Sequence, residues 1–313
     1  MSMSRKIFIV GAGGMVGSVC AYNLLLKELV ENIVLIDIDP IKLNGQYLDL
    51  FHSTVVTKNT KVRIGNYSEI EDDDIVVITA GVAQKPGESR LSLCDSNECI
   101  IEDIVSKIMA NGKNIFILMV TNPVDVLTYI AFKKSGLSKE RVFGSGTTTD
   151  TIRLEAHLSE KLNVDQNNIE GYVLGEHGDS CFTSFSQTKV NGSPLQTLLN
   201  NYQISEIELN QYLRSAALKI IDAKGATYFG IATVVGEILD SLINNKNKIY
   251  NVCSYIENEY GLENTVLSLP HKVSAEGVKI IHDIGFTEKE LGQLKNSSEI
   301  INKYTKKQVL TKQ

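Results

Sequence analysis

A histidine flanked by glycines is the sharpest chemical signal in the sequence. His177 lies in the run Gly175-Glu176-His177-Gly178-Asp179, which offers no apolar face for a structural imidazole to fill. The unperturbed pKa of histidine is about 6.5, so this side chain accepts and returns protons at neutral pH. Removing a hydride from an alcohol leaves one proton to be taken up. His177 is therefore a candidate acid–base residue, although a lone histidine is more often structural.

An aspartate and an arginine three residues apart begin a predicted helix. Asp150 and Arg153 share one helix face, since residues at i and i+3 are neighbours. Asp150 could hold an imidazole in one tautomer and stabilise its protonated form. Arg153 could bind a substrate carboxylate through two parallel hydrogen bonds. The alternative is an ordinary surface ion pair, which contributes little to stability.

Two segments that follow predicted strands add further polar groups. Residues 80–90 place Gln84, Lys85 and Arg90 among glycine and proline, a composition typical of a loop that closes over a substrate. An arginine in such a loop could polarise a carbonyl. Asn122 comes just after an apolar run, and ligands bind at the carboxyl ends of parallel strands. An ordinary surface loop is the alternative for residues 80–90.

A glycine-rich turn follows the first predicted strand. Glycine there lets the backbone approach a pyrophosphate, and the N-terminus of the next helix supplies N–H donors. The spacing departs from G-x-G-x-x-G, because Val16 stands at the sixth position. We expect a dinucleotide to contact Gly11, Gly14, Met15, Val16 and Gly17.

Asp37 strengthens this nucleotide interpretation. It ends the second predicted strand 20 residues after Gly17, where an acid binds the hydroxyls of the adenosine ribose. The negative charge of Asp37 would repel the 2′-phosphate of NADP, so the sequence predicts NAD as the cofactor. The alternative is that Asp37 caps the next helix, a position that Asp39 could also take.

Alternating strand and helix patterns predict how these segments are held. Fully apolar runs alternate with helical spacing such as Gly17–Glu28, which indicates a parallel sheet covered by helices on both faces. The expected strands are Lys6–Val10, Ile33–Ile36, Lys61–Ile64, Ile75–Ile78 and Ile115–Val120. We expect an α/β fold in which residues 1–144 form a Rossmann-type, doubly wound, NAD-binding domain.

The pattern changes around Arg141–Gly146. Helical segments lengthen, and the later apolar runs alternate in a way that suits antiparallel pairing. The expected helices are Asp150–Leu162, Ser205–Ala223, Ile231–Asn244 and Glu288–Lys306, and the expected strands are Ile249–Ile256 and Val273–Ile281. Residues 145–313 are expected to form a C-terminal mixed α+β domain that binds the substrate.

Composition narrows the class of function. The 313 residues are 43% hydrophobic and have a formal net charge of −6, which argues against binding to nucleic acid or an anionic membrane. Five cysteines without a C-x-x-C pair argue against a disulfide framework, and no Cys/His spacing suggests a metal site. No apolar run approaches the roughly 18 residues needed to span a bilayer. We expect a soluble, cytoplasmic protein without a metal.

The four polar segments are residues 80–90, Asn122, Asp150 with Arg153, and Gly175–Asp179. Taken in this order, they resemble the L-lactate/malate dehydrogenase family, and the resemblance extends from Lys6 to the last helix. It implies that His177 is the acid–base residue, that Asp150 orients it and that Arg153 binds the substrate carboxylate. Arg90 would polarise the substrate carbonyl from the loop. The resemblance also implies a homotetramer or dimer that acts on a 2-oxo or 2-hydroxy monocarboxylic acid.

The same resemblance assigns further contacts around the substrate and the cofactor. Asn122 would meet both of them, and Thr227 would line the substrate pocket. The remaining cofactor contacts would be Gly81, Val120, Ser145 and Ile231, the last packing on the nicotinamide.

Gln84 directs the choice of acid. In this family the matching position is typically glutamine in lactate dehydrogenases and arginine in malate dehydrogenases. A neutral side chain suits the methyl group of pyruvate, because a second buried carboxylate would need a cationic partner. We therefore expect reversible hydride transfer between NADH and pyruvate, giving L-lactate.

Three alternatives stay open. Lys85 and the glycine spacing are compatible with malate dehydrogenase activity. The small side chains of Ala216 and Ala217 leave room for bulkier acids, as in the related 2-hydroxyisocaproate dehydrogenases. The third alternative is a non-catalytic NAD-binding protein.

One regulatory expectation concerns two glutamates. Many bacterial members of the family are activated by fructose 1,6-bisphosphate, at positions that are usually arginine and histidine. Glu155 and Glu170 occupy the matching positions here. Two carboxylates would repel a bisphosphate, so we expect no activation by that route.

Overall fold

A twisted eight-stranded sheet forms the centre of the protein. The computed structural model describes residues 5–82, 90–199 and 204–310, with the side chains of 90–93 and 306–310 excepted. The sheet order is β14-β13-β6-β5-β4-β1-β2-β3, and the six strands of the first half run parallel. Those six are β1 (Lys6–Val10), β2 (Asn32–Ile36), β3 (Lys61–Ile64), β4 (Ile75–Ile78), β5 (Phe116–Met119) and β6 (Val142–Gly144). This is the strand order of a doubly wound dinucleotide-binding fold, so the predicted fold class is confirmed.

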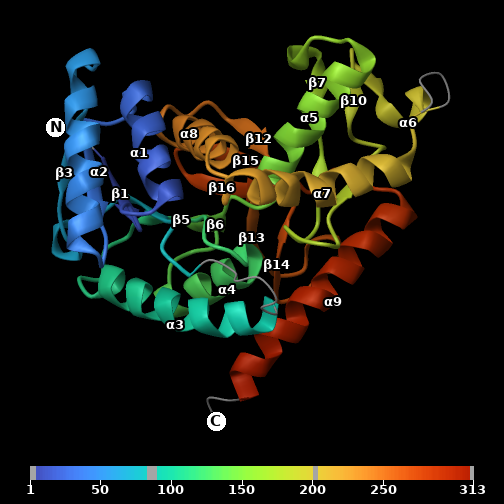
Figure 1. Cartoon of the computed structure of the whole chain (residues 1–313). Helices are drawn as coiled ribbons and strands as arrows, with labels where there is room; N and C mark the ends of the chain where they lie inside the picture. The colour runs from blue at the N-terminus through green and yellow to red at the C-terminus, as the bar shows by residue number, and fades with distance from the viewer. Residues whose placement is uncertain (1–4, 83–89, 200–203, 311–313) are drawn as a thin grey trace.

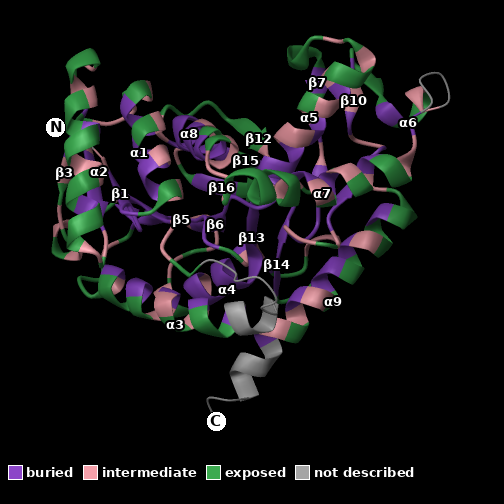
Figure 2. Ribbon diagram, viewed as in Figure 1, coloured by how far each residue is buried: buried purple, intermediate pink, exposed green. Residues whose placement is uncertain are grey.

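Helices cover both faces of the sheet, as Figure 1 shows. One apolar core lies under α3 (Arg90–Met109), α4 (Val124–Ser135) and α9 (Glu288–Leu310). The other lies under α1 (Met15–Lys27), α2 (Pro40–Ser53) and α8 (Phe229–Ile243). Strands such as β4 must be apolar on both faces to fill these two cores, and all four of its residues are fully buried. Figure 2 shows the inner strands of this sheet buried and the outer helix faces exposed.

A smaller third core lies in the second half of the chain. It packs α5 (Thr148–Leu162) against α7 (Glu206–Lys224) and short antiparallel strands. The remaining short elements are α6 (Leu195–Leu198), β7 (Ile169–Glu170), β8 (Val173–Leu174), β9 (Phe182–Thr183), β10 (Lys189–Val190) and β11 (Ser193–Pro194). Single 3-10 turns occur at Thr54–Val56, Tyr67–Glu69, Gln166–Asn168 and Glu259–Gly261. The mixed α+β character expected of this half is confirmed.

The expected strand Ile249–Ile256 is wrong as a single element. It divides into β12 (Lys248–Tyr250) and β13 (Cys253–Ile256), which belong to different sheets. Between them the buried side chain of Asn251 donates a hydrogen bond of 2.9 Å to Thr151 Oγ1, which holds the chain where it passes from one sheet to the other. β13 then extends the central sheet beside β6, and β14 (Thr265–Ser268) follows it.

The expected strand Val273–Ile281 is also two strands. β15 (His271–Ser274) and β16 (Gly277–Ile280) pair antiparallel across a tight turn. Gly277 has a φ of +111°, and a Cβ there would come within 2.2 Å of the Glu140 carbonyl oxygen, so the turn requires glycine. Among the described residues, no helix is both long enough and apolar enough to cross a membrane.

Candidate active site

The first turns of α5 supply the aspartate and the arginine of the site. Nη1 of Arg153 donates a hydrogen bond of 2.8 Å to Oδ1 of Asp150. The side chains are only 13% and 6% exposed, and both line a cavity. The alternative of an ordinary surface ion pair is therefore wrong.

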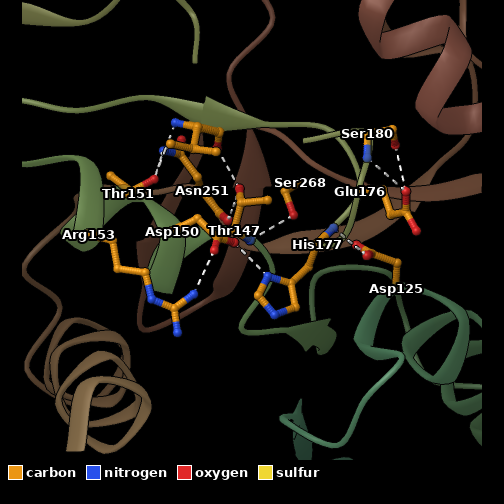
Figure 3. A network of polar contacts seen from close by, with 11 residues as sticks. Asp125, Thr147, Asp150, Thr151, Arg153, Glu176, His177, Ser180, Asn251 and Ser268 are labelled. Atoms are coloured by element: carbon orange, nitrogen blue, oxygen red, sulfur yellow. Dashed lines mark hydrogen bonds and ion pairs between the residues drawn. The ribbon is translucent and has the colours of Figure 1, made fainter. Parts of the chain in front are cut away.

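His177 enters from the loop between β8 and β9. Its Nδ1 lies 2.6 Å from Oδ2 of Asp150, and Figure 3 shows the imidazole and the Arg153 guanidinium on opposite sides of that carboxylate. Gly175 begins the loop with a φ of +92°, and a Cβ there would come within 2.7 Å of Ser297 Oγ. Glycine thus lets this loop turn sharply beside α9.

The charges of these residues set the protonation of the imidazole. Burial alone would lower the pKa of His177, but the negative charge of Asp150 and their hydrogen bond outweigh it, so the pKa lies above the usual value of 6.5. Burial opposes ionisation of Asp150, yet His177 and Arg153 hold the pKa of that carboxyl below its usual value. The arrangement favours a charged imidazolium beside a charged carboxylate.

Asp125, on the first turn of α4, is a second carboxyl beside the histidine that the sequence reasoning missed. Its Oδ2 accepts a hydrogen bond of 2.8 Å from the backbone N–H of His177, and its Oδ1 is buried without a hydrogen-bond partner. Burial raises the pKa of Asp125 to about 7, although the charge of His177 opposes the rise. Its position three residues after Asn122, at the start of a helix, was the signal that could have found it.

The predicted chemical residues meet at one cavity. Asn122, Asp150, Arg153 and His177 all line a cavity of about 210 Å³. Thr227 is not among the described residues that line this cavity. It lies half-buried in the loop between α7 and α8.

Two helices close the cavity with residues that sequence reasoning largely overlooked. α7 contributes Arg214, Ala217 and Leu218, whose i, i+3, i+4 spacing puts them on one helix face. α9 contributes Ile301 and Tyr304. Of these, only Ala217 had been expected near the substrate.

The glycine turn after β1 has the shape that a dinucleotide requires. Gly11 has a φ of +91°, and a Cβ on Gly17 would come within 2.3 Å of the Gly11 carbonyl oxygen. Gly14 is the N-cap of α1 and has no side chain to occupy the N–H groups of the following turn, which begins with Met15 and Val16. Backbone N–H groups at a helix start bind phosphate, so these residues fit the pyrophosphate of NAD.

Asp37 lies beside this turn. Its Oδ2 accepts a hydrogen bond of 2.8 Å from the backbone N–H of Gly13. Asp39 is the residue that caps α2, accepting from the backbone N–H groups of Ile41 and Lys42. The capping alternative for Asp37 is therefore wrong.

The other expected cofactor residues follow neighbouring strands. Gly81 comes after β4, Val120 after β5 and Ser145 after β6, all at the carboxyl edge of the sheet where Gly11 and Asp37 also lie. Ile231 is half-buried in the first turn of α8. Gln84 and Lys85 lie outside the described residues. Arg90 is the first residue of α3, and its side chain also lies outside the described part.

Comparison with known proteins identifies the family. Residues 5–144 match the model of the lactate/malate dehydrogenase NAD-binding domain, and residues 147–311 match that of the lactate/malate dehydrogenase alpha/beta C-terminal domain. The chain belongs to the lactate/malate dehydrogenase family. The expected resemblance is thus confirmed, together with NAD as the cofactor and a dehydrogenase as the class of enzyme.

Several members of this lactate/malate dehydrogenase family are similar to the chain over almost its whole length. L-lactate dehydrogenase 1 of Listeria innocua is 39% identical over 97% of each chain. The L-lactate dehydrogenase of Staphylococcus saprophyticus is 41% identical over 92% of this chain and 91% of its own. The minor L-lactate dehydrogenase of Enterococcus mundtii, solved with ligands bound, matches with a TM-score of 0.92 at 37% identity, over 97% of this chain and 98% of that one.

For a lactate/malate dehydrogenase, the geometry brings together a proton donor and an anion-binding group. Asp150 holds the imidazole of His177 on one oxygen and the guanidinium of Arg153 on the other. A small acid in the cavity would therefore meet a fixed positive charge and a proton donor, both held in place by the carboxylate of Asp150.

Proposed function

We propose that the chain is an NAD-dependent L-lactate dehydrogenase that reduces pyruvate reversibly to L-lactate. The observation that carries the proposal is the shared carboxylate of Asp150, which orients His177 and Arg153 at the wall of one cavity. The printed names of the similar curated proteins, which are L-lactate dehydrogenases, support the same substrate.

Each residue of the site has a proposed role. When bound, NADH supplies the hydride. His177 gives its proton to the substrate oxygen, and Asp150 keeps the imidazole in the orientation that allows this. Arg153 binds the substrate carboxylate, and Arg90 polarises the carbonyl that accepts the electrons.

Substrate selection is proposed to depend on residues around the far end of the acid. Gln84 faces the methyl group of pyruvate, and Asn122 and Thr227 complete the pocket. The uncharged amide of Gln84 would leave a second substrate carboxylate unpaired, which disfavours oxaloacetate.

The cofactor contacts are proposed along the carboxyl edge of the sheet. The turn after β1 binds the pyrophosphate, Asp37 binds the adenosine ribose, and the later strands reach the nicotinamide. The contacts are Gly11, Gly14, Met15, Val16, Gly17, Asp37, Gly81, Val120, Asn122, Ser145 and Ile231.

The two halves of the chain are proposed to divide the work. Residues 1–144 bind NAD, and residues 145–313 bind the substrate. We infer that NADH binds first, that the acid follows, and that the segment from Gln84 to Arg90 then closes and excludes water.

We also infer a homotetramer, or at least a dimer, that works in glycolysis in the cytoplasm. The support for assembly is an exposed apolar stripe along α2 and the turn after it. Ile41 and Val55 are more than four-fifths exposed, and Leu48 and Phe51 lie between them at helical spacing. A second copy of the chain would remove these side chains from water.

A panel of 2-oxo acids, each followed by loss of NADH absorbance, tests the proposed substrate. We expect kcat/KM for pyruvate to exceed that for oxaloacetate and for 2-oxoisocaproate by at least about a hundredfold, the scale on which one misfit group discriminates. A preference for either other acid would reject L-lactate dehydrogenase in favour of that activity. NADH binding without turnover of any acid would indicate a non-catalytic NAD-binding protein.

A further inference from the structure

Asn97 is a fully buried amide on α3, two helical turns after the first residue of that helix. Its Oδ1 accepts a hydrogen bond of 2.8 Å from the backbone N–H of Val82. Its Nδ2 donates to the carbonyl oxygens of Val82, at 3.2 Å, and Asn122, at 2.8 Å. Two carbonyls and one N–H surround the amide, so its orientation is fixed by its partners.

These three bonds join segments that are far apart in the sequence. Val82 ends the described stretch after β4, next to the segment that contains Gln84 and leads into α3. Asn122 follows β5 and lines the cavity beside His177. The side chain of Asn97 therefore holds both Val82, which precedes the segment that contains Gln84, and the backbone of Asn122.

The residues around Asn97 are tightly packed. A Cβ on Gly81 would come within 2.9 Å of Asn97 Oδ1 and within 2.5 Å of Thr121 Cγ2, so only glycine fits there. Thr121 Oγ1 also donates a hydrogen bond of 2.8 Å to the Ala80 carbonyl oxygen. The loops after β4 and β5 are thus packed tightly side by side, and the Asn97 amide contacts both of them.

We propose that Asn97 is a positioning residue for the reaction: it fixes the backbone of Asn122 and anchors the segment after β4 at Val82. It touches neither substrate nor cofactor and acts through those two residues. A displacement of Asn122 by about 1 Å would misplace the bound acid relative to His177, an error that costs on the order of a hundredfold in rate. The proposal rests on the proposed function only in its choice of substrate.

Asn97→Asp is the sharpest test, because it changes one atom. Ionised, the new carboxylate would face two carbonyl oxygens and repel them. Protonated, it can donate to one of them. We therefore expect pyruvate KM to rise and kcat/KM to fall at least about tenfold near neutral pH, with the ratio to wild type recovering as the pH falls. NADH affinity, measured by fluorescence, should change less than about threefold, because the glycine turn after β1 is untouched.

Asn97→Ala and Asp95→Asn complete the design. Asn97→Ala removes all three bonds, so it should lower kcat/KM at every pH without the recovery in acid. Asp95→Asn alters an exposed charge on the same helix and should match wild type. If Asn97→Asp does not fold, Asn97→Ser, which leaves space for a water beside the carbonyls, replaces it and should also raise KM.

Melting temperatures separate positioning from stability. If the Asn97 variants only melt earlier, while the folded enzyme keeps wild-type KM, kcat and pH profile, the amide serves stability alone and the proposal is overturned. If wild type itself fails to reduce pyruvate, the proposed function fails instead, and the variants are compared on whichever 2-oxo acid of the panel wild type reduces. If wild type reduces no acid, both proposals fall.

Discussion

Oδ2 of Asp150 lies 2.6 Å from Nδ1 of His177, while Oδ1 of the same carboxylate accepts a hydrogen bond of 2.8 Å from Arg153. One buried carboxylate therefore sets the protonation of the imidazole and the direction of the guanidinium. Changes at any of the three residues should alter activity in ways that differ and can be measured.

Asp150→Asn should shift the pH profile of pyruvate reduction. In wild type, Asp150 keeps the pKa of His177 above its usual value, and without that charge burial would dominate and lower it. In the proposed mechanism reduction needs protonated His177, so the alkaline limb of the kcat/KM profile should move to lower pH. We expect kcat at neutral pH to fall by about a hundredfold or more.

Asp125→Asn is the matched control for that change. It removes the other carboxyl near His177 but keeps an oxygen for the His177 backbone N–H. Because burial raises the pKa of Asp125 to about 7, its carboxyl is about half protonated at neutral pH, so this variant removes less negative charge than Asp150→Asn does. Its profile should lie nearer to wild type than that of Asp150→Asn, and equal shifts in the two variants would contradict a special role for Asp150.

Arg153→Leu should mainly damage binding of the acid. Loss of charge-assisted hydrogen bonds to a carboxylate costs about 3 kcal/mol, or roughly 150-fold in kcat/KM. Arg153→Lys keeps the charge but loses the paired geometry, so it should recover only part of this. Steady-state kinetics with pyruvate measure both variants. Full activity in Arg153→Lys would mean that charge alone suffices.

A buried neutral histidine that is not among the described residues lining the cavity predicts acid sensitivity. His271 is fully buried, with Nδ1 2.7 Å from the Leu269 carbonyl oxygen and Nε2 2.6 Å from Ser254 Oγ. Burial lowers the pKa of His271 to about 4. Between that value and about 6.5 the unfolded chain binds more protons, so stability falls as the pH drops through this window.

The size of that effect follows from the two pKa values. The free energy of unfolding should fall by about 2 kcal/mol between pH 7 and about pH 4.5 through His271 alone. Denaturant unfolding of wild type and His271→Asn at both pH values isolates this contribution. The variant, although less stable at neutral pH, should lose correspondingly less on acidification; an identical loss in both proteins would show that His271 is not responsible.

Fructose 1,6-bisphosphate should leave the kinetics unchanged. Glu155 is half-buried on α5, where it accepts a hydrogen bond of 3.0 Å from the backbone N–H of Gly171, and burial raises its pKa to about 6. Glu170 is exposed and lies 3.3 Å from Lys189. Neither offers a phosphate a positive charge. The KM for pyruvate, measured with and without millimolar bisphosphate, should be the same, and a several-fold decrease would contradict this.

Much of the fold could be predicted from the sequence because the patterns that indicate it are local. Fully apolar runs such as Ile75–Ile78 predict strands buried on both faces, and Gly11 and Asp37 mark where two strands end. The division of Ile249–Ile256 was not readable. Its break depends on Asn251 binding Thr151, which is a hundred residues away, and alternation within a single run carries no sign of that partner.

The site, like the fold, could be predicted from the sequence only where the signals are local. Asp150 and Arg153 were connected by helical spacing, and His177 by its glycine-rich loop. Asp125 and Asn97 were not found, because each acts through a backbone group of a distant segment: the N–H of His177 and the carbonyl of Asn122. Sequence patterns report side-chain types and spacing, whereas these contacts depend on how two loops are packed.

The turnover of His177→Ala on pyruvate, measured beside its affinity for NADH, tests the central claim most directly. In the proposed mechanism the imidazole donates the proton, and the alanine variant lacks it, while the glycine turn and Asp37 are unchanged. We predict that kcat falls by at least about a thousandfold, within the range of general acid–base catalysis, with NADH affinity retained. An unchanged kcat in the folded variant would contradict the role of His177 and, with it, this account of the site.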